Sequence, residues 1–196
     1  MSTRLIAIGG SAGGLAALKR VLAALPGDAE VPVAVVLHRA PSDARFGLEA
    51  ALQRSSALPI VEPEDKEPIV PGHVYVAPPD YHLLVEHGGF ALSTEGPVNH
   101  ARPSIDVLLE SAVAAYRGGV AAAILTGRGR DGAAGLARVR AAGGTTIVQD
   151  PTTAASPEMP AAAAGAAQRV LPLEEIGPVL SGLAAKSSGH GRRDAA

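Results

Sequence analysis

Hydrophobic and polar positions along this chain follow two alternating patterns, short apolar runs and longer amphipathic stretches. Apolar runs that predict strands lie at 4–9, 31–37, 120–127 and 145–149. Helical patterns cover Leu15–Leu25, Phe46–Gln53, Ser104–Tyr116, about Asp131–Ala142 and Leu173–Ala185, with an alanine-rich segment after Pro160. Strands that alternate with helices are typical of βαβ units, so the pattern predicts an α/β fold. Because the run VAAAILTG does not alternate, we expect a strand buried on both faces near the centre of the sheet.

The middle of the chain has a different pattern. Short strand-like runs lie at 73–78, 82–87 and 90–94, and His87-Gly88-Gly89 joins the last two. Glycines at that position supply the turn of a hairpin, so we expect a small antiparallel excursion here. The tail at 186–196 is polar and lacks periodicity, which predicts disorder after a single domain over 1–185.

Composition narrows the class of function. The chain has 196 residues, 47% hydrophobic and 18% charged, which suits one domain with a substantial core. A net charge of -2, no Trp, three Tyr and two Phe argue against nucleic acid as a partner. Cys is absent, which excludes disulfides and thiolate chemistry. With no apolar run of membrane length and no signal-peptide pattern, we expect a cytoplasmic protein without membrane insertion.

The turn after the first predicted strand carries candidate chemistry. Residues Gly9-Gly10-Ser11-Ala12-Gly13 match G-x-S-x-G, in which the glycines allow a sharp turn that exposes the serine hydroxyl. Ser11 is then either a nucleophile or a helix cap. A dinucleotide site would have glycine at position 11, although Arg39, after the second strand, keeps an NADP alternative open.

A nucleophilic serine needs a base and a group that orients the base. His38 ends the second predicted strand and should face the Ser11 turn, because parallel strands end at the same edge of the sheet. Asp131 lies in the glycine-flanked loop LTGRGRDGAAG after another buried strand. The alternative for Asp131 is a helix cap. None of the six histidines forms an HxH or HExxH pair, so we expect no zinc site.

Five stretches resemble the catalytic domain of the chemotaxis protein-glutamate methylesterases, the CheB family. They are IGGSAGG, VVLHRAP, the pair VYVAPPDYHLLV and NHARPSIDVLLESA, and ILTGRGRDGAAGLARVRAAGGTTIVQDP. They occur in the family's order and span nearly the whole domain. Members usually also carry a phosphorylatable receiver domain before the catalytic domain, whereas this sequence begins at the catalytic strand.

The resemblance implies a doubly wound, mainly parallel sheet that carries a serine hydrolase triad of Ser11, His38 and Asp131. It implies oxyanion donors at the backbone N–H groups of Ala12 and Arg128, and it implies neither a cofactor nor a metal. The implied reaction is hydrolysis of glutamate γ-methyl esters on chemoreceptor-like proteins, with glutamine deamidation as a related activity. The alternative from another class is a non-catalytic signalling or binding module of the same fold.

The sequence departs from the family at the mouth of the expected site. Ala12 replaces a common Thr, while Arg128 and Arg130 replace Met and Asn. Because the oxyanion donors are backbone groups, these changes leave them in place. The two arginines favour an acidic surface near the ester. Arg102 is a further candidate for contact with the substrate, with a structural salt bridge as the alternative.

Overall fold

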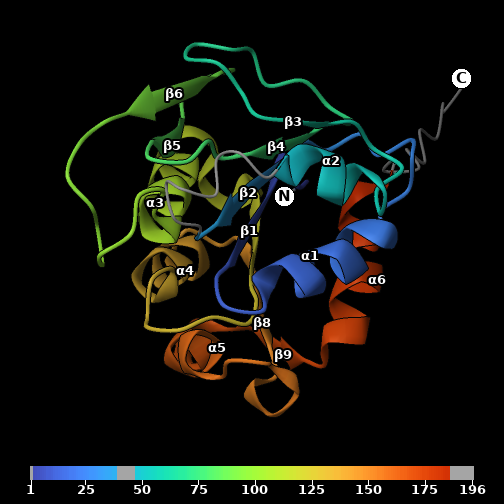
Figure 1. The fold of residues 1–196 in the computed structure, drawn as a ribbon, viewed down its shortest axis with the longest axis vertical. Coiled ribbons are helices and arrows are strands. Elements are labelled where there is room, and N and C mark those ends of the chain that lie inside the picture. Colours follow the sequence, from blue (N-terminus) through green and yellow to red (C-terminus); the bar gives the residue numbers. More distant parts are fainter. Residues whose placement is uncertain (1, 39–46, 186–196) are drawn as a thin grey trace, which may run out of the picture.

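A computed structural model describes residues 2–38 and 47–185 of the chain. Within these ranges the main sheet has seven strands, all parallel (Figure 1). In spatial order they are β3 (Ile60–Val61), β4 (Val74–Val76), β2 (Val33–Leu37), β1 (Leu5–Gly10), β7 (Val120–Ile124), β8 (Thr145–Gln149) and β9 (Arg169–Leu171). A separate antiparallel pair consists of β5 (His82–Val85) and β6 (Phe90–Ser93). The predicted α/β architecture with a small hairpin is confirmed.

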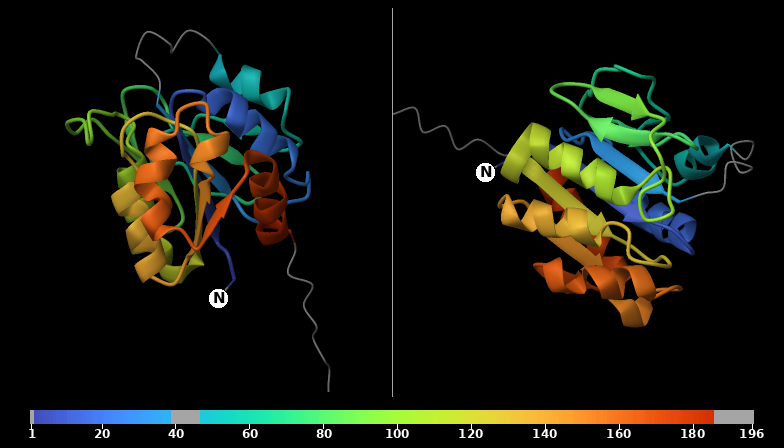
Figure 2. Two further views of the ribbon diagram at one scale, coloured as in Figure 1. Left: turned by 90° about the horizontal axis from the view of Figure 1, so that it is seen from below. Right: turned by 90° about the vertical axis from the view of Figure 1, so that its left-hand side faces the viewer.

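Helices cover both faces of the sheet, as Figure 2 shows in the view from below. One face carries α1 (Gly14–Ala23), α2 (Leu48–Gln53) and α6 (Leu173–Ala184). The other face carries α3 (Ile105–Tyr116), α4 (Ala133–Ala141) and α5 (Glu158–Ala163), together with the β5–β6 hairpin. Single turns of 3-10 helix lie at Arg117–Gly119, Pro151–Thr153 and Ala164–Ala166. The sheet is therefore doubly wound.

Strand β1 lies in the middle of this sheet and contributes to both cores. Ile6 and Ile8 pack into the cluster under α1 and α6, while Leu5 and Ala7 pack into the cluster under α3 and α4. All four are at most 1% exposed. Strand β7 is its immediate neighbour and is buried along its whole length, as the lack of alternation predicted.

The pattern of the sequence did not predict the two edge strands. β3 has two residues and β9 has three, which is too short for any periodicity to show. Phe46 and the tail at 186–196, for which we expected the start of a helix and disorder, lie outside the described residues. None of the helices in the described ranges is long and apolar enough to cross a bilayer.

Candidate active site

The register of two neighbouring strands places Ser11 beside His38. The last paired residues of β1 and β2 are Gly10 and Leu37, so Ser11 and His38 each follow directly after the end of the pairing. The His38 backbone N–H donates to the Gly10 carbonyl oxygen at 3.0 Å and extends the pairing by one step. Both residues therefore lie at the carboxyl edge of the sheet, where α/β proteins bind ligands.

Asp131 reaches the same edge from the other side of β1. It lies in the loop between β7 and α4, and its Oδ2 is 2.7 Å from His38 Nε2. The histidine side chain is 18% exposed, and the aspartate side chain is 2% exposed. Because a carboxylate only accepts hydrogen bonds, Nε2 carries the hydrogen of this pair. His38 Nδ1 is then the ring nitrogen left to act as a base.

Three further donors at the start of α3 surround the Asp131 carboxylate. Oδ2 also accepts the Ile105 backbone N–H at 2.7 Å, and Oδ1 accepts the Asp106 backbone N–H at 3.1 Å. The hydroxyl of Ser104 donates to Oδ1 at 2.8 Å. Burial acts to raise the pKa of Asp131, but its hydrogen bonds with His38, Ile105 and Ser104 outweigh burial and lower the pKa below its usual value. The carboxylate is thus held in its ionised form.

Neither Ser11 nor Asp131 caps the helix that follows it. The residues at the two helix starts are Gly13 before α1 and Gly132 before α4, at φ 78° and 92°, and neither start has a side-chain cap. Within the described ranges the Ser11 hydroxyl makes no hydrogen bond. The interpretation of these two residues as caps of their own helices is therefore wrong.

The glycine loop after β7 packs directly on the Ser11 turn. The Ser11 N–H donates to the Thr126 carbonyl oxygen at 3.0 Å, and Thr126 Oγ1 donates to the Ala12 carbonyl oxygen at 3.0 Å. A Cβ added at Gly127 would lie 2.9 Å from Ser11 Cβ and 2.7 Å from Met159 Sδ. Only glycine allows the two loops to approach this closely.

Two backbone donors at this junction are available to a ligand. In the part of the chain that the structure describes, neither the Ala12 N–H nor the Arg128 N–H meets an acceptor. The next N–H in the loop, that of Gly129, donates to Glu158 Oε2 at 3.0 Å and fixes the loop conformation. Unsatisfied N–H groups beside a nucleophile suit an oxyanion.

The three candidate arginines have different surroundings. Arg128 and Arg130 are exposed and form no ion pair with other described residues. The Arg102 guanidinium instead binds within the protein through all three nitrogens. Nε and Nη2 donate to Asp80 Oδ1 at 3.0 and 2.6 Å, and Nη1 donates to the carbonyl oxygens of Thr94 and Glu95. A structural role thus accounts for Arg102, the alternative that the sequence left open.

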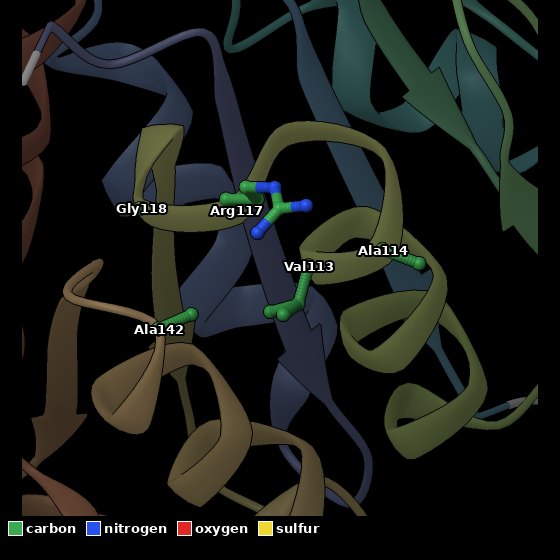
Figure 3. Close-up of a pocket in the computed structure, with 5 residues that line it drawn as sticks. All are labelled: Val113, Ala114, Arg117, Gly118 and Ala142. Carbon is green, nitrogen blue, oxygen red and sulfur yellow. The ribbon is translucent and has the colours of Figure 1, made fainter.

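A surface pocket lies at the other end of the sheet. Its lining residues are Val113, Ala114, Arg117, Gly118 and Ala142 (Figure 3). Arg117 and Gly118 lie in the 3-10 turn just before β7, whereas Asp131 follows the strand, so the pocket and the candidate site are at opposite ends of it. Across the described ranges no group of three or more His, Cys, Asp or Glu side chains is arranged to hold a metal ion.

A serine, a histidine and an aspartate at the carboxyl edge of a parallel sheet, next to two available N–H groups, define a candidate site of the serine hydrolase class. The chain belongs to the CheB methylesterase family, which matches residues 6–180. It is also similar to the crystal structure of the Thermotoga maritima CheB methylesterase catalytic domain, with a TM-score of 0.87 and 35% identity. That match covers 93% of this chain and 100% of the solved chain.

Relatives from several bacteria agree with this membership. A protein of Nocardioides sp., "Protein-glutamate methylesterase/protein-glutamine glutaminase", is 45% identical over 89% of this chain and 49% of its own length. A relative from Leptospira interrogans is 43% identical over 90% of this chain and 92% of its own length. This chain therefore spans about half the length of the first relative and nearly all of the second. Neither the family nor these relatives support the NADP alternative or a non-catalytic module.

Sequence reasoning gave no role to Asn99 or to Asp106. Both lie in the stretch NHARPSIDVLLESA, which carried part of the family resemblance, whereas Gly127 belongs to the glycine-flanked loop that the sequence did single out. The one available signal was that polar residues flank the start of a predicted apolar helix. Which carboxylate they contact depends on how α3 packs against the loop after β7.

Proposed function

We propose that this chain is a serine hydrolase that removes methyl groups from glutamate γ-methyl esters of a chemoreceptor-like protein in the cytoplasm. The observation that carries the proposal is the 2.7 Å pair of His38 Nε2 and Asp131 Oδ2, because strand register holds this histidine beside Ser11. Family membership supports the choice of ester.

The first half of the reaction forms an acyl-enzyme. Ser11 Oγ attacks the ester carbonyl carbon while His38 Nδ1 takes the hydroxyl proton, which requires the two atoms to come within hydrogen-bond reach once substrate binds. Asp131 stabilises the resulting imidazolium through Nε2. The Ala12 and Arg128 N–H groups bind the oxyanion. His38 then returns the proton to the leaving methoxide, and methanol departs.

The second half regenerates the enzyme. His38 takes a proton from water, the hydroxide attacks the acyl carbon, and Ser11 Oγ leaves with that proton. The products are glutamate carboxylate and one released proton. Glutamine is a second candidate substrate, because the same steps would release ammonia instead of methanol and the Nocardioides relative carries both activities in its name.

The test measures methanol release from a methylated chemoreceptor cytoplasmic fragment. Loss of the nucleophile in Ser11→Ala should reduce the rate by about 10⁴- to 10⁶-fold. Ser181→Ala, a serine substitution on the distant helix α6, is the matched control and should retain the wild-type rate. Equal rates for the wild type and Ser11→Ala would refute the proposal. Labelling by a fluorophosphonate should likewise require Ser11.

A further inference from the structure

One amide side chain joins the two buried carboxylates next to the candidate site. Asn99 Nδ2 donates to Asp106 Oδ2 at 2.8 Å and to Asp131 Oδ1 at 3.3 Å. The two aspartates are 6% and 2% exposed. An amide nitrogen carries two hydrogens, so it can serve both acceptors at once without adding charge.

The backbone around Asn99 holds this amide in place. Val98 and Ala101 exchange backbone hydrogen bonds at 3.1 and 3.0 Å, which closes a tight turn with Asn99 and His100 in the middle. Their φ angles are 50° and 63°. Turns with two left-handed central residues favour asparagine, so residue 99 suits the backbone as well as the contact. The Arg102 guanidinium binds carbonyl oxygens on the approach to this turn and secures the segment.

Each carboxylate also accepts backbone N–H groups from the first turn of the other carboxylate's helix. Asp131, just before α4, accepts N–H groups from the first turn of α3, the helix that contains Asp106. Asp106 Oδ1 accepts the Gly135 N–H from the first turn of α4 at 2.7 Å. Both helix starts therefore depend on a pair of like charges packed close together.

The negative charges of two neighbouring carboxylates repel each other, so each of the two aspartates opposes ionisation of the other. Burial raises the pKa of Asp106, the bond from Gly135 lowers it, and the charge of Asp131 raises it further. The other carboxylate that acts on Asp106 is Glu110, whose side chain pairs with Arg138. The Asn99 amide faces both members of the pair, and it counteracts their repulsion by giving each one a hydrogen bond.

We propose that Asn99 is a positioning residue: its amide keeps the carboxylates of Asp106 and Asp131 together so that Asp131 stays ionised and aimed at His38. The catalytic consequence rests on the function proposed above, whereas the effect on His38 does not depend on it. Asn99 itself does not touch the reacting atoms in this role. It acts through Asp131.

The test variant is Asn99→Gly, because glycine accepts the positive φ of this position and removes the side chain that carries the amide. His100→Gly is the matched control, since it alters the neighbouring turn residue, whose side chain makes no hydrogen bond with other described residues. A third protein, Asn99→Gly with Asp106→Asn, leaves a single buried carboxylate. The amide oxygen that this second change introduces can still accept the Gly135 N–H.

Two measurements are made on all four proteins. Methanol release gives kcat and KM. NMR titration of the His38 ring gives the midpoint, the pH at which half of the rings are protonated. We expect Asn99→Gly to lower kcat about tenfold with little change in KM, as for loss of a bond to a charged group. We also expect it to shift the His38 midpoint. The double variant should restore both kcat and the His38 midpoint to the wild-type values, and His100→Gly should match the wild type. Melting temperatures show whether all four proteins fold.

Several outcomes would overturn the proposal. One is that Asn99→Gly behaves like His100→Gly in both measurements. Another is a change in KM alone, which would assign the residue to substrate contact. A third is that Asp106→Asn fails to reverse the effects of Asn99→Gly, which would assign the loss to disorder of the turn. If the wild type releases no methanol, the proposed function fails, and the His38 midpoints alone decide the role of Asn99.

Discussion

The backbone N–H of Ile105 and the Nε2 atom of His38 both donate to the same oxygen of Asp131, each at 2.7 Å. The first bond fixes the start of α3 to the loop after β7, and the second orients the candidate base. One buried carboxylate oxygen thus both stabilises the start of α3 and orients the candidate base. Substitutions at Asp131 should therefore change stability and activity together.

Asp131→Asn should lower turnover by about 10⁴-fold, because an amide favours the wrong tautomer of His38. It should also lower the free energy of unfolding by about 1–3 kcal/mol, since the amide NH₂ group would face some of the donors that the carboxylate now accepts. Ester hydrolysis and urea unfolding test the two effects. A variant with normal stability and normal turnover would show that neither role is correct.

The stability of the wild type should fall in acid partly through Asp131. Its pKa is lowered in the folded state, so its contribution is complete above the unfolded value of about 4 and is lost as the pH falls through the lower folded value. Asp106 acts in the opposite direction, because its raised pKa costs stability as the pH rises. Urea unfolding from about pH 6 to about pH 2 should show a smaller loss for Asp131→Asn than for the wild type. Parallel curves would contradict this assignment.

Gly127→Ala should damage the candidate site by forcing the loop after β7 away from Ser11. The added Cβ would lie 2.9 Å from Ser11 Cβ, and relief of such overpacking costs about 1–3 kcal/mol. We expect turnover to fall at least about tenfold, because the Arg128 N–H moves with the loop. Gly165→Ala is the control, since a Cβ there meets nothing within 4 Å. Similar turnover for the two variants would refute close packing at Gly127.

Reversal of the charges at Arg128 and Arg130 should weaken turnover of a receptor fragment that is acidic around the ester. Both side chains are exposed, so the effect should be about tenfold at low salt and should shrink as salt screens it. Hydrolysis of a small neutral ester should change little. Arg169→Glu, an exposed arginine at the start of edge strand β9, is the control. An equal loss with the control, or no salt dependence, would exclude a specific acidic surface.

Much of the fold could be predicted because long, strongly patterned segments determine it. The strand at 145–149 has the predicted bounds, and the helix predicted over Ser104–Tyr116 begins only one residue later. The strands β3 and β9 could not be predicted, since pairing at the edge of an existing sheet defines them more than their own sequence does.

The candidate site, too, has residues that the sequence could predict and residues that it could not. Ser11, His38 and Asp131 follow predicted strands, and the rule that parallel strands end at one edge was enough to group them. The contacts of Asn99 and Asp106 depend on how α3 docks against α4. Docking of this kind depends on shape, including the absence of a side chain at Gly135, where a Cβ would lie 2.7 Å from Leu109 Cβ.

Because Gly10 pairs with Leu37, the register of β1 and β2 sets the relative position of Ser11 and His38, the residues that follow. Loss of one residue inside β1 or β2 would displace Ser11 or His38 by about 3.3 Å, more than a proton transfer tolerates. Extra residues at exposed Gly27 and Asp28, ahead of β2, would leave the spacing unchanged. Insertions in that connection should therefore preserve the relative position of Ser11 and His38, whereas insertions or deletions within β1 or β2 should not.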